Sequence, residues 1–471
     1  MSHIFISAAH KSSGKTTISI GLTAALRSMN LNVQTFKKGP DYIDPMWLSR
    51  ASQHHCYNLD FYTMQQAEIV EKFNRHSHDC DISLIEGNKG LYDGLDLDGS
   101  NSNAALSTLL HAPVVLVIDS RGMTRGIAPL VLGYQAFDKH INIQGVILNQ
   151  VGGSRHEGKL RAILEHYTDV HVLGAVHKDS SLNIDERHLG LIPSNEEHLA
   201  DQKIKYIADR VKEQVNLEEL LSIAATAKAP EPDSKYTIEA PSIIDNSLKI
   251  GIFRDESFGF YYPDDLEAMT SYGAELLFID ATKDQHLPPV DGLFIGGGFP
   301  ETQMQALQDN HSLKTSVKEA IENGLPAYAE CGGLMYLSRS ITWNDKKFDM
   351  ANVIQGDIVM HKKPQGRGYI KLEETHSHPW DNTDREQVIF AHEFHYSELV
   401  NVDVDYAHAY KVLRGTGIDG QHDGLIYKNL LANYAHLRNT NNNHWVKRFI
   451  QFISQTRNPC HLLASTSITQ N

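Results

Sequence analysis

Cysteine is scarce in this chain, which has four cysteines in 471 residues. A disulfide-stabilised scaffold needs a much denser set, so that class is excluded and a reducing, cytoplasmic setting is expected. Long apolar runs are also missing, and none approaches the ~20 residues that span a bilayer. The start, MSHIFISAAHKSS, lacks the charged segment and long apolar segment of a signal peptide. We therefore expect a cytoplasmic protein without a membrane segment.

Basic side chains are outnumbered as well, with 43 Lys and Arg against 58 Asp and Glu and a formal net charge of −15. This balance argues against a nucleic-acid-binding surface. Histidine is plentiful, and the clusters at 54–56, 75–80 and 375–380 invite a zinc interpretation. Their spacings are not the paired patterns of structural zinc sites. Solvated loops are the favoured interpretation of these clusters, and a metal site is the alternative.

The hydrophobic fraction of 41% is enough for buried cores, and the length suggests two or three domains. In the first half of the chain, short apolar runs typical of buried strands alternate with helical patterns. The predicted strands cover 3–9, 32–38, 82–87, 113–120, 143–151 and 169–176. This alternation predicts an α/β domain with a parallel, doubly wound sheet.

Residues 226–247 are rich in Pro, Ala and polar residues and have no clear period, which favours a linker. The alternating pattern then restarts in a second α/β region. Its predicted strands lie within 248–255, 274–281, 291–301 and 325–333. We expect a first domain at 1–225 and a second at 248–455.

The segment AAHKSSGKTT (8–17) ends like a Walker A loop, although Ala9 takes the place of the first glycine. In such a loop, backbone N–H groups and the start of the following helix hold phosphates. Lys15 would reach the outer phosphates, and Thr16 would hold Mg²⁺. An ordinary turn is the alternative, but a strand before and a helix after the segment favour nucleotide binding. The predicted ATP-binding residues are Ser13, Gly14, Lys15, Thr16 and Thr17.

Acidic side chains follow two other predicted strands. In LIEGNKGLYDG (84–94), Glu86 ends an apolar strand beside glycines, where a carboxylate can bind Mg²⁺ as a Walker B acid does. A strand-end surface acid is the alternative. In FKKGPDYIDP (36–45), two lysines could meet anions, and Asp41 and Asp44 could meet a metal or a substrate group.

One cysteine stands out, in AYAECGGLMYLSRS (327–340). Cysteine is among the most buried residue types, and Cys56, Cys80 and Cys460 look like ordinary thiols. Cys331 lies where a predicted strand gives way to a predicted helix, and two glycines after it allow a tight turn. We expect its side chain to be exposed there, with the thiolate near the helix N-terminus.

A nucleophile also needs an oxyanion hole and a base. The loop IGGGFPE (295–301) follows a strand of the same predicted sheet, and its N–H groups, with that of Gly332, could form the hole. His392, His395 and His436 are the candidate bases. The spacing alone does not choose among them.

Eight sequence blocks, taken together, resemble those of the cobyrinate a,c-diamide synthase family. They are SSGKTT, KGPDYIDP, EGNKGLYDG, ERHLGL, GGGFPE, CGGLMYL, HEFHYS and a late YAHL. The resemblance covers nearly the whole chain. It implies an N-terminal domain similar to dethiobiotin synthetase and a C-terminal domain similar to class I glutamine amidotransferases. It also implies a ligase that uses ATP, Mg²⁺ and glutamine to amidate the a and c acetate carboxylates of cobyrinate in cobalamin biosynthesis.

The resemblance assigns roles residue by residue. Cys331 becomes the nucleophile that attacks glutamine, and His436 raises its nucleophilicity, whereas His395 becomes a loop residue. The oxyanion hole predicted above from the glycine segments is assigned to Gly297 and Gly332. The metal would be held by Thr16, Asp44 and Glu86, and the substrate would be contacted by Asp41 and Asp93.

Two departures qualify this resemblance. Many class I amidotransferases have a glutamate two residues after the histidine, whereas this chain has Arg438, so a Cys–His pair without an evident third member is expected. Lys89 stands in the loop after Glu86, where the family suggests apolar residues. Diamidation of hydrogenobyrinate or nickel sirohydrochlorin stays an alternative. A P-loop ATPase switch with an inactive glutaminase domain is another, and the intact Cys331–His436 pair argues against it.

Overall fold

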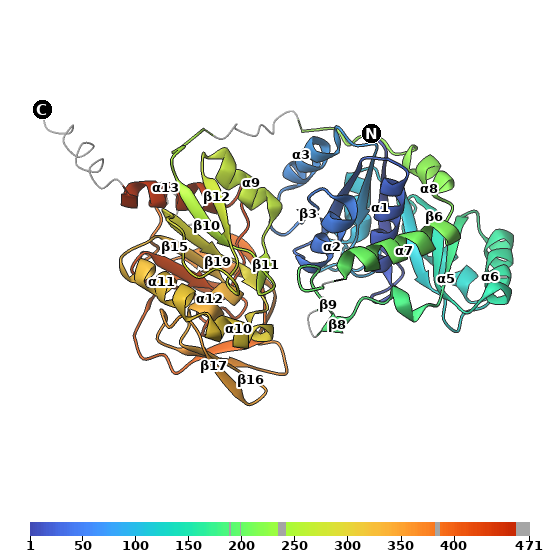
Figure 1. The fold of residues 1–471 in the computed structure, drawn as a ribbon. Helices are drawn as coiled ribbons and strands as arrows, with labels where there is room; N and C mark the ends of the chain where they lie inside the picture. Colours follow the sequence, from blue (N-terminus) through green and yellow to red (C-terminus); the bar gives the residue numbers. More distant parts are fainter. Residues whose placement is uncertain (188–189, 198, 234–241, 382–386, 458–471) are drawn as a thin grey trace, which may run out of the picture. The chain divides into compact units, whose positions relative to one another are not determined.

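The chain is described by a computed structural model that covers residues 1–187, 190–197, 199–233, 242–381 and 387–457. It divides into two compact units, residues 1–237 and 238–471 (Figure 1). None of the described helices is both long and apolar enough to cross a membrane. The domain boundaries expected from the sequence stay a prediction.

Seven parallel strands form the central sheet of the first unit, in the order β3-β2-β4-β1-β5-β6-β7. The strands of this unit are β1 (His3–Ala8), β2 (Val33–Lys38), β3 (Tyr57–Leu59), β4 (Ile82–Glu86), β5 (Val114–Asp119), β6 (Ile143–Val151), β7 (His171–His177) and the short pair β8 (Glu186–Arg187) and β9 (Gly190–Leu191). All six strands predicted from the sequence are confirmed. The additional strand, β3, has three residues and lies at the sheet edge.

Helices cover this sheet. They are α1 (Lys15–Ser28), α2 (Ile43–Ser52), α3 (Gln66–Ser77), α4 (Asn103–Leu109), α5 (Ile127–Phe137), α6 (Ser154–Tyr167), the 3-10 turn η1 (Ser180–Leu182), α7 (Ala200–Gln214) and α8 (Leu217–Ala224). Helix α1 packs against α2 and α7, while residues of α3 to α6 share one apolar core with the sheet (Figure 1).

The strand order determines where the first site lies. Strands β2, β4 and β1 are neighbours and run parallel, so their carboxyl ends meet at one edge of the sheet. The loop 9–14 leaves β1 at this edge, Glu86 is the last residue of β4, and 39–42 follow β2. Ligand sites of open parallel sheets lie at this edge.

The second unit contains a nine-stranded mixed sheet in the order β12-β10-β13-β15-β24-β23-β22-β19-β20. Its strands and those of the smaller sheets are β10 (Lys249–Phe253), β11 (Phe258–Phe260), β12 (Glu275–Ile279), β13 (Gly292–Ile295), β14 (Gly297–Gly298), β15 (Ala327–Glu330), β16 (Ser340–Trp343), β17 (Lys346–Asp349), β18 (Asp357–Met360), β19 (Gly366–Glu374), β20 (Ile389–His395), β21 (Ser397–Val400), β22 (Ala407–Arg414), β23 (His422–Tyr427) and β24 (Leu430–Asn433). From β12 to β24 the strands are parallel, and the rest of the sheet is antiparallel.

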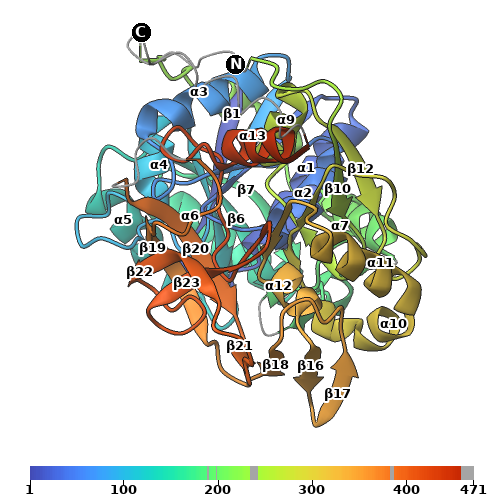
Figure 2. The same cartoon turned by 90° about the vertical axis from the view of Figure 1, so that its left-hand side faces the viewer.

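The described helical segments of this unit are α9 (Pro263–Ser271), η2 (Pro300–Thr302), α10 (Met304–Asp309), α11 (His311–Glu322), α12 (Gly332–Leu337) and α13 (Trp445–Arg457). A small sheet, β17-β16-β18-β21, extends from the unit below α12 in Figure 2. Strand β15 lies beside β24, with Glu330 opposite Asn433. Residues that follow these two strands therefore meet at one edge of the large sheet.

Candidate active sites

The loop between β1 and α1 has a backbone shape suited to phosphate binding. Gly14, directly before α1, has a φ angle of 79°. A Cβ atom at this position would lie 2.2 Å from Nδ2 of Asn149, which donates a hydrogen bond to the carbonyl of Ser13 at 2.9 Å. Only glycine fits both constraints. The hydroxyl of Tyr134 donates to the carbonyl of Ala9, the residue in the place of the first glycine.

A cluster of lysines, a hydroxyl and carboxylates lies at the start of α1. The Thr16 hydroxyl donates to Oε1 of Glu86 at 2.8 Å and lies 3.2 Å from Oδ2 of Asp44. The Lys15 ammonium is 3.2 Å from the same Glu86 oxygen. The Lys37 ammonium donates to that oxygen at 2.8 Å and also contacts Oδ2 of Asp44. The structure thus brings together the residues predicted for phosphate and metal, and it adds Lys37 to them.

Burial and opposite charges change the pKa values within this cluster. Burial alone would lower the pKa of Lys37, but Asp44, Glu86 and Asp41 raise it well above its ordinary value. Burial also opposes the ionisation of Asp44, yet Lys37 and Lys15 hold its pKa below the usual value. For Lys15, burial outweighs the Glu86 charge and lowers the pKa. The cluster therefore favours a charged Lys37 beside a charged Asp44.

Glu86 has one oxygen that the described residues do not satisfy. Its Oε1 accepts from three donors, whereas its buried Oε2 has no hydrogen-bond partner in the described part of the chain. A buried carboxylate oxygen without a partner is costly. The Thr16 hydroxyl contacts both the Glu86 and the Asp44 carboxylates. Oxygen ligands of this kind, completed by phosphate and water, suit Mg²⁺, so the residues present fit this metal.

The other predicted residues of the first unit lie near the same edge. Asp41 precedes α2 and accepts the N–H of Asp44 at 3.1 Å. Burial and the Asp44 charge raise the pKa of Asp41 to about 7. Asp93, in the loop after β4, accepts the N–H of Gly90 at 2.9 Å. Thr17 is the third residue of α1. Substrate contact by Asp41 and Asp93 stays a prediction.

In the second unit, Cys331 joins β15 to α12 on a strained turn. Its φ and ψ angles, 46° and −95°, lie outside the regions that residues other than glycine commonly adopt. Its N–H donates to the carbonyl of Asn433 at 2.7 Å, which extends the pairing of β15 with β24. Backbone strain of this size persists only where surrounding contacts hold it, and it is common at active sites.

The expectation that the Cys331 side chain is exposed is wrong, because the residue is 6% exposed and belongs to an apolar core. Burial, and then the charges of Glu301 and Glu330, raise the pKa of its thiol far above the ordinary value. The N–H of Gly332 opposes this effect only in part. The resting cysteine is therefore a thiol, and it needs a base before it can attack.

His436 lies three residues after the end of β24. Its Nδ1 atom is 3.4 Å from Oε2 of Glu330. The backbone N–H of His436 donates to the backbone carbonyl of His392 at 2.8 Å. A Cβ atom on Gly297 would lie 2.5 Å from Cε1 of His436, so the glycine allows the imidazole to approach. Cys331 and His436 follow neighbouring strands at the same edge of the sheet.

The two glycine segments predicted for the oxyanion hole approach each other. Strand β14, which holds Gly297 and Gly298, pairs with β11. A Cβ atom on Gly332 would lie 2.9 Å from the backbone nitrogen of Gly298. This places both segments next to Cys331, as an oxyanion hole requires. Their role in stabilising an oxyanion stays a prediction.

His395 has a different set of contacts. Its ring stacks on Tyr434 with centroids 3.8 Å apart, its Nδ1 is 2.8 Å from the carbonyl of Ser397, and its Nε2 is 3.7 Å from Glu393. These contacts join the ring to Tyr434, which follows β24, and to Ser397, the first residue of β21. The choice of His436 over His395 as the base stays a prediction.

Arg438, two residues after His436, is a buried cation and not a third catalytic carboxylate. Its Nη2 atom is 3.3 Å from Oδ2 of Asp264, and its guanidinium lies 4.7 Å from the centre of the Tyr262 ring. The carboxylate near His436 instead comes from Glu330. Sequence reasoning missed Glu330, because its closeness to His436 depends on the pairing of two strands about 100 residues apart.

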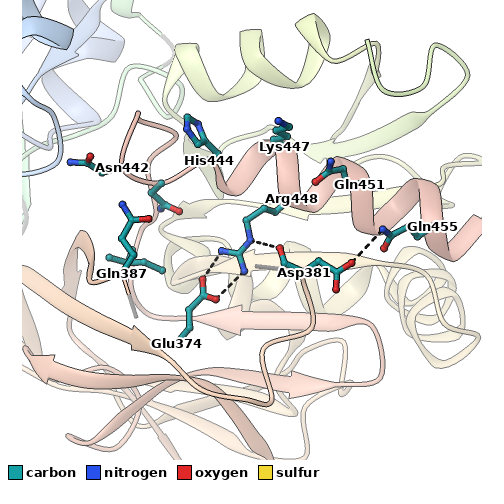
Figure 3. A pocket seen from close by; sticks show the side chains of 11 residues that line it. Glu374, Asp381, Gln387, Asn442, His444, Lys447, Arg448, Gln451 and Gln455 are labelled. Carbon is teal, nitrogen blue, oxygen red and sulfur yellow. Dashed lines mark hydrogen bonds and ion pairs between the residues drawn. The ribbon is translucent and has the colours of Figure 1, made fainter. Parts of the chain in front are cut away.

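A cavity of about 480 Å³ in the second unit has another character (Figure 3). Its wall includes Arg448, whose guanidinium makes a two-pronged ion pair with Glu374 and also donates to the carbonyl of Asp381. Neither Cys331 nor His436 lines it. The charged groups at its centre satisfy one another, which is typical of a structural ion pair.

Comparisons with known proteins identify both units. The family model of a CobB/CobQ-like glutamine amidotransferase domain matches residues 249–444, and that of an AAA domain matches residues 33–184. A cobyrinate a,c-diamide synthase of Magnetococcus marinus is 44% identical over 92% of this chain and 93% of that protein. A protein of the same name from Archaeoglobus fulgidus is 38% identical over 93% of this chain and 94% of that protein. One from Methanosarcina acetivorans is 39% identical over 92% of this chain and 92% of that protein.

Proposed function

The chain belongs to the cobyrinate a,c-diamide synthase family, and we propose that it amidates the a and c acetate carboxylates of cobyrinate in cobalamin biosynthesis, with ATP and glutamine. It is a ligase that forms carbon–nitrogen bonds. The proposed domains are an ATP- and substrate-binding domain, 1–225, a linker, 226–247, and a glutamine amidotransferase domain, 248–455. A cytoplasmic location is part of the proposal, supported by the low cysteine content.

Ammonia is released in the second domain. His436 takes the Sγ proton of Cys331, and the sulfur attacks the side-chain amide carbon of glutamine. N–H groups of the Gly297 and Gly332 segments would stabilise the oxyanion. The nitrogen leaves as ammonia after it receives the proton from His436, and a thioester remains. Water then hydrolyses the thioester, so that glutamate leaves and the thiol is restored.

The carboxylate is activated in the first domain. A carboxylate is a poor electrophile, whereas the acyl phosphate formed by transfer of the γ-phosphoryl group of ATP is a good one. Lys15 would bind the outer phosphates, and Thr16, Asp44 and Glu86 would hold Mg²⁺, which neutralises developing phosphate charge. Ammonia then attacks the acyl carbon, phosphate leaves, and an amide is formed. The reaction occurs twice, once on each acetate.

One observation carries the proposal, namely that a single chain of this family combines two kinds of site. In the first unit, the loop before α1 lies beside the carboxylates of Asp44 and Glu86. In the second unit, Cys331 and His436 follow the neighbouring strands β15 and β24. The test incubates the purified chain with ATP, Mg²⁺ and glutamine and with cobyrinate, hydrogenobyrinate or nickel sirohydrochlorin in turn. Mass spectrometry should detect one and then two amidations of cobyrinate, with ADP release. Amidation of another macrocycle instead of cobyrinate would overturn the substrate assignment.

A further inference from the structure

We infer that Glu330 is the positioning residue of the glutaminase site, where its carboxylate orients His436 as the base for Cys331. The inference rests on the proposed glutamine hydrolysis and adds the group that the Cys–His pair lacks. The residue directly before the nucleophile would then supply the third member of a Cys331–His436–Glu330 relay.

The surroundings of Glu330 fit this role. It ends β15, it is 2% exposed, and its Oε2 lies 3.4 Å from Nδ1 of His436. Its other oxygen, Oε1, accepts the hydroxyl of Tyr328 at 2.6 Å and the N–H of Leu437 at 2.9 Å. Two donors thus hold the buried carboxylate in place, and its other oxygen is the one nearest the imidazole. A group fixed in this way can fix the ring in turn.

The usual position for such a carboxylate is taken by a cation. Arg438, two residues after His436, is 1% exposed, and its guanidinium interacts with Asp264 and Tyr262. A positive charge at this position cannot stabilise a protonated imidazole. A negative charge beside the imidazole can come from another element, and β15, which pairs directly with β24, places Glu330 there.

The chemistry follows from the side of the ring that the carboxylate faces. A carboxylate beside Nδ1 keeps a proton on that nitrogen, which leaves the lone pair of Nε2 to accept the Sγ proton of Cys331. When Nε2 is protonated, the neighbouring Glu330 carboxylate stabilises the imidazolium. The buried thiol, whose pKa is raised, makes such help more important.

The chain also contains a matched comparison. Glu393, 1% exposed, likewise uses its carboxylate to accept two N–H groups, those of Thr416 and Gly417, and it lies 3.7 Å from Nε2 of His395. Glu330 and Glu393 thus share burial, two donors and a neighbouring histidine. They differ in whether that histidine is the proposed base, so Glu393→Gln controls for the loss of a buried charge.

The experiment compares Glu330→Gln with Glu393→Gln in the full chain. A carboxamide still accepts from Tyr328 and Leu437, but its NH₂ group donates to Nδ1 of His436 and moves the ring proton to Nε2. We expect kcat with glutamine to fall at least about 100-fold, with KM for glutamine nearly unchanged. Ammonia-dependent amidation should be retained, and Glu393→Gln should stay within about threefold of the wild-type kcat.

The pH profile gives a second readout, which a purely structural role would not move. In Glu330→Gln the protonated imidazole loses a stabilising negative neighbour, so the acidic limb of the kcat/KM profile for glutamine should shift to lower pH. Glu330→Asp retains the charge and should recover part of the lost kcat. The inference is overturned if Glu330→Gln keeps wild-type kcat, or if the two Gln variants lose kcat equally.

Two further outcomes are a Glu330→Gln variant that does not fold and a failure of the proposed glutamine hydrolysis itself. If Glu330→Gln does not fold, as judged by circular dichroism, the Asp variant decides: about a tenfold loss of kcat with unchanged KM supports the inference, and wild-type kcat contradicts it. Failure of the proposed function would look different, because Cys331→Ser would then leave glutamine use intact.

Discussion

The imidazole of His392 lies almost parallel to that of His436, with 4.9 Å between the ring centroids and 16° between the planes. Two backbone hydrogen bonds between the same residues join β20 to the segment after β24. Burial, and then the charges of His436 and Arg438, hold the pKa of His392 well below its ordinary value. His392 is therefore neutral at neutral pH and supports one face of the proposed base.

This relationship predicts a pH-dependent stability. The unfolded chain binds a proton at His392 near pH 6.5, whereas the native chain does not, so stability falls as the pH drops below about 6.5. The contribution is at most about 1.4 kcal/mol per pH unit. His392→Phe should remove it while a ring still packs on His436. Urea unfolding between pH 5 and 7.5, monitored through the buried Trp380 and Trp445, measures the difference. An equally steep slope in the variant would contradict the prediction.

The choice of base predicts a difference between two histidine variants. His436→Ala should lower kcat with glutamine by about 10²–10⁴-fold, because a general base contributes on this scale. His395→Ala should have a much smaller effect, since its ring contacts Tyr434 and Ser397 instead. Steady-state kinetics with glutamine and with ammonia measures both. A larger selective loss of glutamine use in His395→Ala would identify the wrong histidine.

The proposed ATP and Mg²⁺ site at the start of α1 predicts that its variants lose amidation activity with either nitrogen source. Lys15→Ala and Glu86→Gln should each reduce amidation about 100-fold or more with glutamine and with ammonia alike, because carboxylate activation precedes both. The exposed Lys139, changed to Ala, controls for the loss of a positive charge. Product formation with each nitrogen source is the measurement, and near-normal turnover with ammonia in either cluster variant would count against the assignment.

The approach of Gly297 to His436 predicts the effect of a single methyl group. In Gly297→Ala, where the backbone φ angle is not in the left-handed region, the new Cβ would lie 2.5 Å from Cε1 of His436, so the ring or the loop must shift. A shift of this kind should lower kcat with glutamine about 10–100-fold and leave ammonia-dependent amidation intact. Gly158→Ala, in helix α6 where a Cβ meets no atom within 4 Å, is the control. Equal glutamine kinetics in both variants would be inconsistent with a crowded site.

Local patterns in the sequence predict the parallel strands well. The strand predicted at 143–151 coincides with β6, and that at 82–87 differs from β4 by one residue, because buried parallel strands are continuous apolar runs. The antiparallel half of the second sheet was not predicted. Its strands β19 (Gly366–Glu374) and β22 (Ala407–Arg414) have irregular burial patterns, and β20 and β21 lie between them in the chain, so no local pattern defines their register.

The site residues likewise divide into those that local sequence motifs predict and those that depend on the pairing of distant strands. Motifs located Lys15, Glu86 and Cys331, since each follows or ends a recognisable strand. They did not reveal that Lys37 lies between two carboxylates or that Glu330 faces His436, because both contacts depend on the pairing of separate strands. The burial of Cys331 was also missed, since the apolar core around α12 includes strands far along the chain.

The central claim is that glutamine hydrolysis and carboxylate activation are separate activities of one chain. It is tested most directly by measuring the amidation of cobyrinate by Cys331→Ser with glutamine and, separately, with ammonia. Cys80→Ser, at a half-buried free thiol in the first unit, is the control. The account predicts that Cys331→Ser loses glutamine-dependent amidation and keeps ammonia-dependent amidation at close to the wild-type rate. Loss of both activities in the folded variant, or retention of both, would contradict it.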